Sequence, residues 1–302
     1  RMSETLGRVV TDQGDKTAYD AASQCSRCGY CEQACPTYVV TGREPLSGRG
    51  RNQLVRMLLE GKVEDPSSIE EALSTCLLCG ACTAACYAHV PTAELVLEGR
   101  RMIRGKRAPT PVRLLEWMLA EHPRALASVL KAAFFLKRLG VSRLVARSGL
   151  LRLAGLAALE TAERQLEEAP REILAERLRG DASLRLKPGA RWLYFAACGP
   201  NYLLPRVGLA SVRVLKRLLG PGAFLDNGCC GLLSYNYGSL DAARDFARRT
   251  IERFERAEAA CRAQASSGGE PIVVSDCSSC AAHLKGYGRL FLDEPRWRER
   301  AE

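Results

Sequence analysis

Eight cysteines in two copies of one short pattern constrain this chain more than any other feature. Residues 25–36 read CSRCGYCEQACP and residues 76–86 read CLLCGACTAAC, so both copies contain C-x2-C-x2-C-x3-C. Three thiolates at this spacing can wrap one face of an iron–sulfur cube, while the fourth reaches the other cube in paired arrangements. The spacing therefore predicts two [4Fe-4S] clusters with interleaved ligands. They are Cys25, Cys28, Cys31 and Cys86 for the first cluster, and Cys76, Cys79, Cys82 and Cys35 for the second.

A glycine follows the second cysteine in both copies, at Gly29 and Gly80. Glycine has no Cβ, so we expect positive φ and a close approach of the backbone to the cluster at both positions. Structural zinc and disulfides are the alternatives. Zinc sites usually use paired C-x2-4-C ligands and have no use for a third cysteine two residues on. Disulfides would not produce two copies of one eleven-residue pattern. We favour iron–sulfur ligation. A further hypothesis is a zinc-stabilised interaction protein, and metal analysis that found zinc without iron and sulfide would establish it.

The cysteine count and the charge indicate an intracellular metalloprotein. The chain has 302 residues with 14 Cys and a formal charge of +10. Metal ligation explains so many cysteines better than an oxidising compartment does. Residues 1–16 lack the apolar core of a signal peptide, so we expect a cytoplasmic protein. Residues 100–187 contain 19 Lys and Arg and 9 Asp and Glu, so this segment alone has a net charge of +10. We expect it to dock on acidic neighbours or on a partner subunit, and not on nucleic acid.

The middle of the chain, residues 109–179, has apolar residues at helical spacing throughout. Residues 141–159 are apolar enough to suggest a membrane span, but Arg143, Arg147 and Arg152 interrupt them, and a central arginine is unfavourable in a bilayer. We favour amphipathic helices that pack on protein. Peripheral contact with the cytoplasmic side of a membrane stays open as the alternative.

Strands and helices alternate in the last third of the chain. Strands are predicted at 191–197, 223–225 and 271–275, with helices at 207–219 and 241–265, which indicates a parallel α/β sheet. A cysteine group follows each strand, and the carboxyl ends of parallel strands share one edge. We therefore expect five thiols at one edge, forming a larger iron–sulfur cluster or a redox-active thiol site; core cysteines plus zinc are the alternative. These thiols belong to Cys198, Cys229, Cys230, Cys277 and Cys280.

The remaining metal-binding residue types are isolated. Cys261 lies within a predicted helix without companions and is interpreted as a buried apolar residue. His89, His122 and His283 are interpreted as structural, although His283 follows Cys280 closely enough to line the thiol site.

The order of two cysteine motifs, a helical segment and then C…CCG…C-x2-C resembles the glycolate oxidase iron–sulfur subunit. The broader set includes lactate-utilisation proteins, the anaerobic glycerol-3-phosphate dehydrogenase anchor subunit and heterodisulfide reductase subunits. The most similar stretches are CGYC at 28–31, CPTY at 35–38, GRGR at 48–51 and LKGYG at 284–288. The resemblance implies that the five C-terminal cysteines lie in a cysteine-rich CCG domain and hold a third, non-cubane [4Fe-4S] cluster.

The sequence also departs from this family in three places. Tyr87 replaces the usual proline after the second motif, and the span from Cys230 to Cys277 is longer than is typical. The family usually carries two CCG modules and this sequence shows one, so we expect it to be a fragment or a partner to supply the second.

Together these patterns predict an α plus α/β architecture in three parts. An all-helical two-cluster ferredoxin domain is expected at 1–107, a basic helical segment at 108–187 and the parallel-sheet CCG domain at 188–302. The resemblance implies an electron-transfer subunit of an oxidoreductase that serves an FAD-containing dehydrogenase of a 2-hydroxy acid such as glycolate or lactate, with a quinone or another acceptor downstream. The chain has no G-x-G-x-x-G after a strand, so flavin is expected on the partner. The alternative is a heterodisulfide reductase-like subunit that reduces a disulfide at the CCG site.

Overall fold

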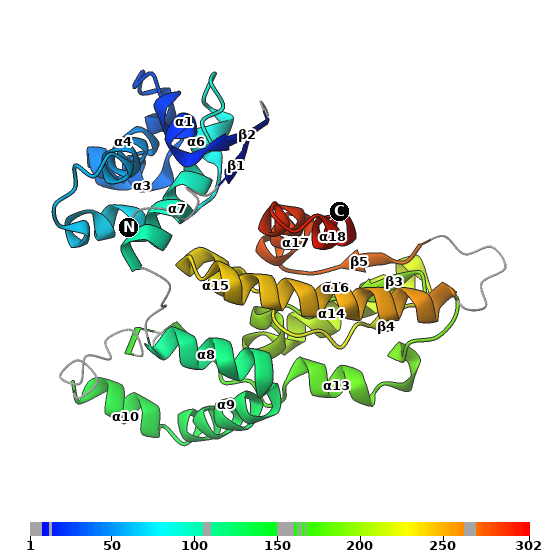
Figure 1. Cartoon of the computed structure of the whole chain (residues 1–302). Coiled ribbons are helices and arrows are strands. Elements are labelled where there is room, and N and C mark those ends of the chain that lie inside the picture. The colour runs from blue at the N-terminus through cyan, green and yellow to red at the C-terminus, as the bar shows by residue number, and fades with distance from the viewer. Residues whose placement is uncertain are drawn as a thin grey trace. The chain divides into compact units, whose positions relative to one another are not determined.

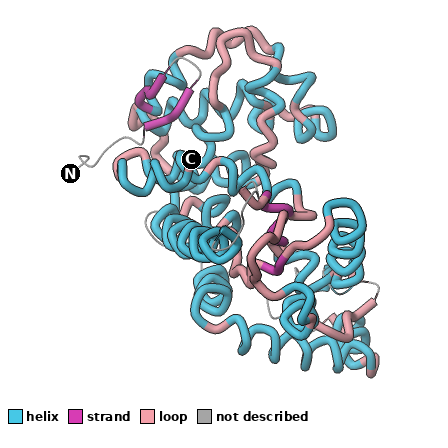
Figure 2. Tube along the Cα trace, turned by 90° about the vertical axis from the view of Figure 1, so that its right-hand side faces the viewer, coloured by secondary structure: helices cyan, strands magenta, loops and turns pink. Residues whose placement is uncertain are grey.

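The computed structural model describes residues 8–11, 14–104, 110–149, 160–161, 163, 165–166, 168–262 and 270–302. Helices dominate it (Figures 1 and 2). Its contacts divide the chain into two compact units. The first contains the residues up to Arg113 together with 233–244 and 288–299, and the second contains 114–232, 245–287 and 300–302. The three-part domain division stays a prediction, and the expected helical residues 150–159 lie outside the described residues.

The first unit begins with a small antiparallel hairpin that the sequence patterns do not predict. Strands β1 (Arg8–Thr11) and β2 (Gly14–Thr17) pair with each other, and helix α1 (Ala18–Ser23) follows at once. Helix α1 begins only at Ala18 because β2 is paired through Thr17. The hydroxyl of Thr17 then caps α1 by accepting a hydrogen bond from the Asp20 N–H.

Short helices surround the two cysteine motifs, and longer ones form the core beneath them. Val55, Leu95 and Val96 are buried there against the alanines of α1. The short elements are α2 (Tyr30–Ala34), α3 (Pro36–Thr41), η1 (Glu44–Leu46), η2 (Pro66–Ile69), α5 (Glu70–Ser74) and α6 (Ala81–Ala84). The longer helices are α4 (Gly48–Leu59) and α7 (Thr92–Arg104). Three short elements come from later in the chain: α15 (Leu232–Tyr237), η5 (Tyr287–Phe291) and α18 (Pro295–Ala301).

The middle segment is mostly helical where it is described, as expected. It contains α8 (Thr110–Glu121), α9 (Pro123–Arg138), α10 (Val141–Arg147), α13 (Leu174–Gly180) and η3 (Ala182–Leu184). Pro123 fits the first turn of α9, and Gly140 separates α9 from α10 with φ of 81°. In the part of the chain that the structure describes, no helix combines the length and the apolar character needed to cross a bilayer.

The predicted parallel sheet is confirmed in the second unit. Strands β3 (Trp192–Tyr194), β4 (Ala223–Phe224) and β5 (Ile272–Val274) are parallel in the order β4-β3-β5. Alternate residues of the central strand point to opposite faces. Leu193 and Phe195 pack with residues of α16 (Leu240–Arg262) and α17 (Ser278–Lys285), whereas Trp192 and Tyr194 pack with residues of α13 and α14 (Pro205–Leu219). Helices therefore cover both faces of the central strand, and the ends of the strands are left free to form a site.

Candidate iron–sulfur sites

The eight motif cysteines line two separate small cavities in the first unit, and both open to solvent. The first is lined by Cys25, Cys28, Cys31 and Cys86, and Cys82 also reaches its wall. The second is lined by Cys35, Cys76, Cys79 and Cys82. Each cavity thus receives three thiols from one motif and the last thiol from the other. The structure brings the predicted quartets together; that they ligate clusters stays a prediction.

The repeated motif has the same backbone conformation twice. Gly29 and Gly80 have φ of 88° and 73°, which confirms the predicted positive values. Arg27 and Leu78, which directly precede the second cysteine of each motif, also have positive φ, at 62° and 53°. Positive φ is uncommon in residues with a Cβ. Its recurrence at matched positions shows that both motifs turn around their cavities in the same way.

Gly48 lies where the two sites approach each other. A Cβ at this position would lie 2.8 Å from the Cβ of Cys82 and 3.2 Å from the Sγ of Cys31. These two cysteines belong to different predicted quartets. The start of α4 therefore fits between the sites only because residue 48 has no side chain. A Cβ on Gly50 would be 2.1 Å from the carbonyl oxygen of Glu44, so the second glycine of this GRGR stretch is required by its own turn.

The two arginines of the same stretch serve different cavities. Arg49 lines the first cavity and pairs with two carboxylates, at 2.7 Å from Glu44 and 2.6 Å from Glu32. It also donates a hydrogen bond to the carbonyl oxygen of Arg27 at 3.2 Å. Arg49 therefore holds the positive-φ turn of the first motif in place.

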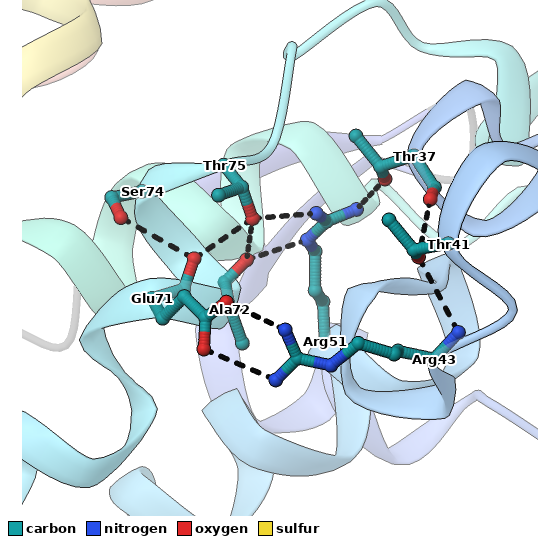
Figure 3. A network of polar contacts seen from close by, with 8 residues as sticks. All are labelled: Thr37, Thr41, Arg43, Arg51, Glu71, Ala72, Ser74 and Thr75. Carbon is teal, nitrogen blue, oxygen red and sulfur yellow. Dashed lines mark hydrogen bonds and ion pairs between the residues drawn. The ribbon is translucent and has the colours of Figure 1, made fainter.

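Arg51 lines the second cavity, with 2% of its surface exposed (Figure 3). Its guanidinium group donates hydrogen bonds to the hydroxyls of Thr37 and Thr75, at 3.0 and 3.3 Å, and to the carbonyl oxygen of Ala72 at 2.8 Å. Nη1 also lies 3.6 Å from the Sγ of Cys35. No carboxylate pairs with Arg51 among the described residues. A buried cation is unfavourable without an anion, and the thiolates of the second quartet are the nearest groups that can supply one.

Arg100 stabilises the chain segment that leads into the second motif. Its buried guanidinium donates hydrogen bonds to the carbonyl oxygens of Leu73, Ser74 and Cys76, at 2.8, 3.2 and 2.7 Å from Nη2. The last carbonyls of a helix have no partner within the helix, so Arg100 satisfies the end of α5 where the chain turns into the cysteine motif. It therefore helps to fix the position of Cys76.

Burial and hydrogen bonding give the motif thiols different pKa values. Burial raises the pKa of Cys31 to about 11 and also raises the pKa of Cys82. Burial acts in the same direction on Cys35, but hydrogen bonds from Thr37 and the Tyr38 N–H, with the charge of Arg51, outweigh it and lower its pKa. Ligation of the buried thiols as thiolates therefore needs a positive group in the cavity, and the iron of a cluster meets this need.

The five C-terminal thiols come together at the edge of the sheet. Cys230 and Cys280 have their Sγ atoms 3.3 Å apart, and the Gly231 N–H donates a hydrogen bond to the Sγ of Cys229 at 3.4 Å. Hydrogen bonds from Cys198 and Cys230 lower the pKa of Cys229 to about 3. The Cys229 partner raises the pKa of Cys198 and of Cys230. Burial raises the pKa of Cys277 and the nearby Cys280 also affects it, so every member of the predicted set has another member as a neighbour.

Two aromatic side chains close this thiol site. His283 is buried, its ring lies edge-on to the ring of Tyr287 at 5.3 Å, and burial lowers its pKa to about 4, so it is neutral at pH 7. The hydroxyl of Tyr287 donates a hydrogen bond to the carbonyl oxygen of Cys230 at 2.7 Å. Cys261 is buried, as expected, in an apolar core cluster that also contains Cys230 and Cys280. All the cysteines are unpaired, and within the described residues no group of three or more His, Cys, Asp or Glu is arranged to hold a single metal ion.

The donor sets fit iron–sulfur clusters. Two quartets consist of thiols alone, surround a cavity each and have interleaved membership, which is the arrangement of a protein with two cubane clusters. A third all-thiol set follows at the edge of a small parallel sheet. These features define the chain as a dicluster iron–sulfur protein with a cysteine-rich α/β domain.

Known families and proteins match most of the chain. A family model described as a 4Fe-4S dicluster domain matches residues 21–90, and one described as a cysteine-rich domain, CCG, matches residues 192–285. The chain is 28% identical over 288 residues to a probable glycolate oxidase iron-sulfur subunit of Bacillus subtilis and 27% identical over 280 residues to the glycolate oxidase iron-sulfur subunit of Escherichia coli. Both alignments cover 92% of the chain. The chain is therefore similar to glycolate oxidase iron–sulfur subunits over most of its length, and it contains regions that match both domain models.

Other similarities are partial. Lactate utilization protein A of Bacillus licheniformis is 37% identical over 109 residues, which are 36% of this chain and 40% of that protein. The chain spans 61% of the length of both glycolate oxidase subunits. No solved structure matches the chain.

Sequence reasoning does not identify the residues that support the cysteines. The GRGR stretch stands out in the sequence only as part of the family resemblance, although its glycines fit close approaches and its arginines serve one cavity each. The density of glycine and arginine between two cysteine motifs is the signal that could have found it. Arg100 gives no signal, because it lies among other basic residues of an amphipathic helix.

Proposed function

We propose that the chain is the electron-transfer subunit of a multi-subunit oxidoreductase. An FAD-containing partner oxidises a 2-hydroxy acid such as glycolate or lactate, and the electrons pass through this chain towards a quinone or another acceptor. One-electron transfer is the chemistry that [4Fe-4S] clusters supply when they are bound. The names of the two relatives that align over 92% of the chain support this role.

The observation that carries the proposal is the pair of thiol-lined cavities on the two sides of Gly48. Cys31 and Cys82, one from each quartet, both lie within 3.2 Å of the position of its missing Cβ. Two redox centres held this close to each other suit electron transfer between them. The chain's own residues hold the thiols, supply buried positive charge at Arg51 and keep the two sites adjacent.

The interleaved ligation can be tested with matched cysteine variants. We expect Cys86→Ser to perturb the same electron paramagnetic resonance (EPR) signal as Cys28→Ser, because both side chains line the first cavity. Cys35→Ser should instead match Cys79→Ser. If Cys86→Ser altered the signal that Cys79→Ser alters, each motif would hold its own cluster and the crossed assignment would be wrong.

The electron-transfer role itself requires the native complex. We expect anaerobic purification of the complex to give a flavoprotein partner and 2-hydroxy-acid dehydrogenase activity. The Cys28→Ser and Cys79→Ser variants should retain the partner while losing electron transfer to an external acceptor. A complex without a flavoprotein, or full activity in both variants, would refute the role.

We also propose that the five C-terminal thiols bind a third, non-cubane [4Fe-4S] cluster. Iron and sulfide analysis distinguishes the outcomes, since two cubes contain eight irons and three clusters contain twelve. Zinc without iron would instead identify the zinc-stabilised interaction protein.

A second candidate function is disulfide reduction at this edge. The short Sγ–Sγ distance of 3.3 Å between Cys230 and Cys280 favours it, because a dithiol at this separation can form and release a disulfide. Cys230→Ala should then abolish disulfide turnover and leave the cubane signals unchanged. Unchanged turnover in this variant would exclude the second candidate.

A further inference from the structure

A cavity in the second unit opens beside two of the five C-terminal thiols. It has a volume of about 220 Å³ and opens to solvent, so it is somewhat smaller than the roughly 300–1,000 Å³ of typical small-molecule sites. Cys198 and Cys229 lie in its wall, whereas the other three thiols of the set do not. Residues of α8, α9 and α13 line it on one side, and residues that follow β3 and β4 and residues of α16 complete it. The basic middle segment and the CCG sheet therefore build this cavity together.

Part of the wall is apolar. Leu119, Ile173 and Phe246 come from three separated parts of the chain, are all buried, and line the same cavity. The polar Asn201 and Asn227 are occupied by the fold: Asn201 accepts a hydrogen bond from the Ala175 N–H at 2.8 Å, and Asn227 bonds both backbone groups of Ala196. The apolar part of a ligand would therefore contact the side chains of Leu119, Ile173 and Phe246.

The charged part of the wall has more cations than anions. Four arginines and two carboxylates line the cavity. Both carboxylates are already paired: Asp226 with Arg179 at 2.8 Å, and Glu176 with Lys131 at 2.5 Å. Arg249 pairs with Glu121. These contacts neutralise the local anions and use two of the cations.

The other two arginines keep their charge. Arg253 donates one hydrogen bond, to the uncharged carbonyl oxygen of Asp226 at 3.1 Å. Arg124 stands at the start of α9, and among the described residues neither guanidinium pairs with a carboxylate. A guanidinium group binds a carboxylate through charge-assisted, often bidentate hydrogen bonds. The cavity thus offers positive charge and apolar surface beside the sulfur atoms of Cys198 and Cys229.

From this arrangement we propose that the cavity binds an organic carboxylate with an apolar body. Its anionic group is held by Arg124 and Arg253, and its body covers the apolar wall next to Cys198 and Cys229. Such a ligand would lie against the third thiol set and not against the two cubane sites. The inference depends on the second unit alone and not on the proposed electron donor, so binding can be measured whether or not the electron-transfer role holds.

The test uses 2-naphthoate as the probe and 2-naphthamide as its neutral counterpart of the same shape. Both are titrated by isothermal calorimetry into the anaerobically purified full chain. We expect one saturable site for the acid and affinity for the amide lower by about tenfold, since a charge-assisted hydrogen bond is roughly twice as strong as a neutral one. Equal affinity of acid and amide, or no saturable binding of the acid, would overturn the proposal.

One double variant and one matched control locate the site. The double variant Arg124→Gln/Arg253→Gln should lose the preference for the acid and bind the amide unchanged. Arg256→Gln is the matched control, because Arg256 is exposed on α16 one turn after Arg253 and does not line the cavity. Circular dichroism and iron content should match those of the unmodified chain in both. If the double variant kept the preference, or if the control lost it equally, the site would not be this cavity.

Discussion

Replacing Arg51 by glutamine is expected to make one cubane cluster harder to reduce and to leave the other unchanged. Arg51 is almost fully buried, donates to three oxygen acceptors and lies 3.6 Å from the Sγ of Cys35. Glutamine can retain a hydrogen bond but removes the charge. Because an added electron is stabilised by a nearby cation, its removal should lower the reduction potential of the cluster to which Cys35 belongs.

The size of the shift follows from Coulomb's law. The added electron is spread over the cluster, so a distance of roughly 6 Å from the guanidinium is used in place of the 3.6 Å to the sulfur. At an effective dielectric constant of about 20 this gives about 3 kcal/mol, or about 120 mV for a one-electron couple. We therefore expect a shift on the order of 100 mV for one cluster only.

An EPR-monitored redox titration under anaerobic conditions measures both potentials in one sample. Arg51→Lys keeps the charge and should restore most of the potential, although it loses the planar fork. Arg43→Gln is the control, because Arg43 belongs to the same polar network through Glu71 but has no contact with sulfur (Figure 3). If Arg51→Gln retained full iron with both potentials unchanged, or if both clusters shifted equally, the electrostatic argument would be wrong. If Arg51→Gln loses iron, Arg51→Lys becomes the test. A reduction potential of the Cys35 cluster that falls by about 100 mV in Arg51→Lys, which retains the charge, would also refute the argument.

Three further predictions concern other parts of the chain. Gly48→Ala should lower the iron content, because the new Cβ would lie 2.8 Å from a neighbouring Cβ, whereas Gly180→Ala, which meets no atom within 4 Å, should not. Tyr287→Phe should lower the free energy of unfolding in urea by about 1 kcal/mol, because it leaves a buried carbonyl oxygen without its donor; an unchanged value would contradict this. Lys216 and Ser183 lower the pKa of Asp181 to about 2, so the stability from this pair is fully present above about pH 4 and is lost as the pH falls through 2. A double-mutant cycle between Asp181 and Lys216 should therefore give the same coupling, below about 1 kcal/mol for this part-exposed pair, at pH 8 and at pH 5, and a loss within that range would refute the assignment.

The sequence by itself determined the local part of each site. Three cysteines within seven residues, with a glycine after the second, can turn around a cavity in only a few ways, and the observed φ of 88° at Gly29 and 73° at Gly80 follows from that spacing. The parallel sheet could also be predicted, because short apolar runs alternate with helical patterns. Parallel strands share one edge for their carboxyl ends, so the order of strands and helices is enough to bring together cysteines that lie far apart in the chain.

Only the tertiary structure decided which other side chains reach the sulfur atoms. Nothing in the local pattern of Arg51 distinguishes a buried donor to sulfur from the exposed arginines around it, because its burial depends on how α4 packs beside the motif that ends in Cys35. The same holds for Arg124 and Arg253, which come from helices separated by more than a hundred residues and line one cavity. Spacing along a chain fixes the geometry of near neighbours, whereas contacts between distant segments depend on the shapes and charges that pack together in the folded protein.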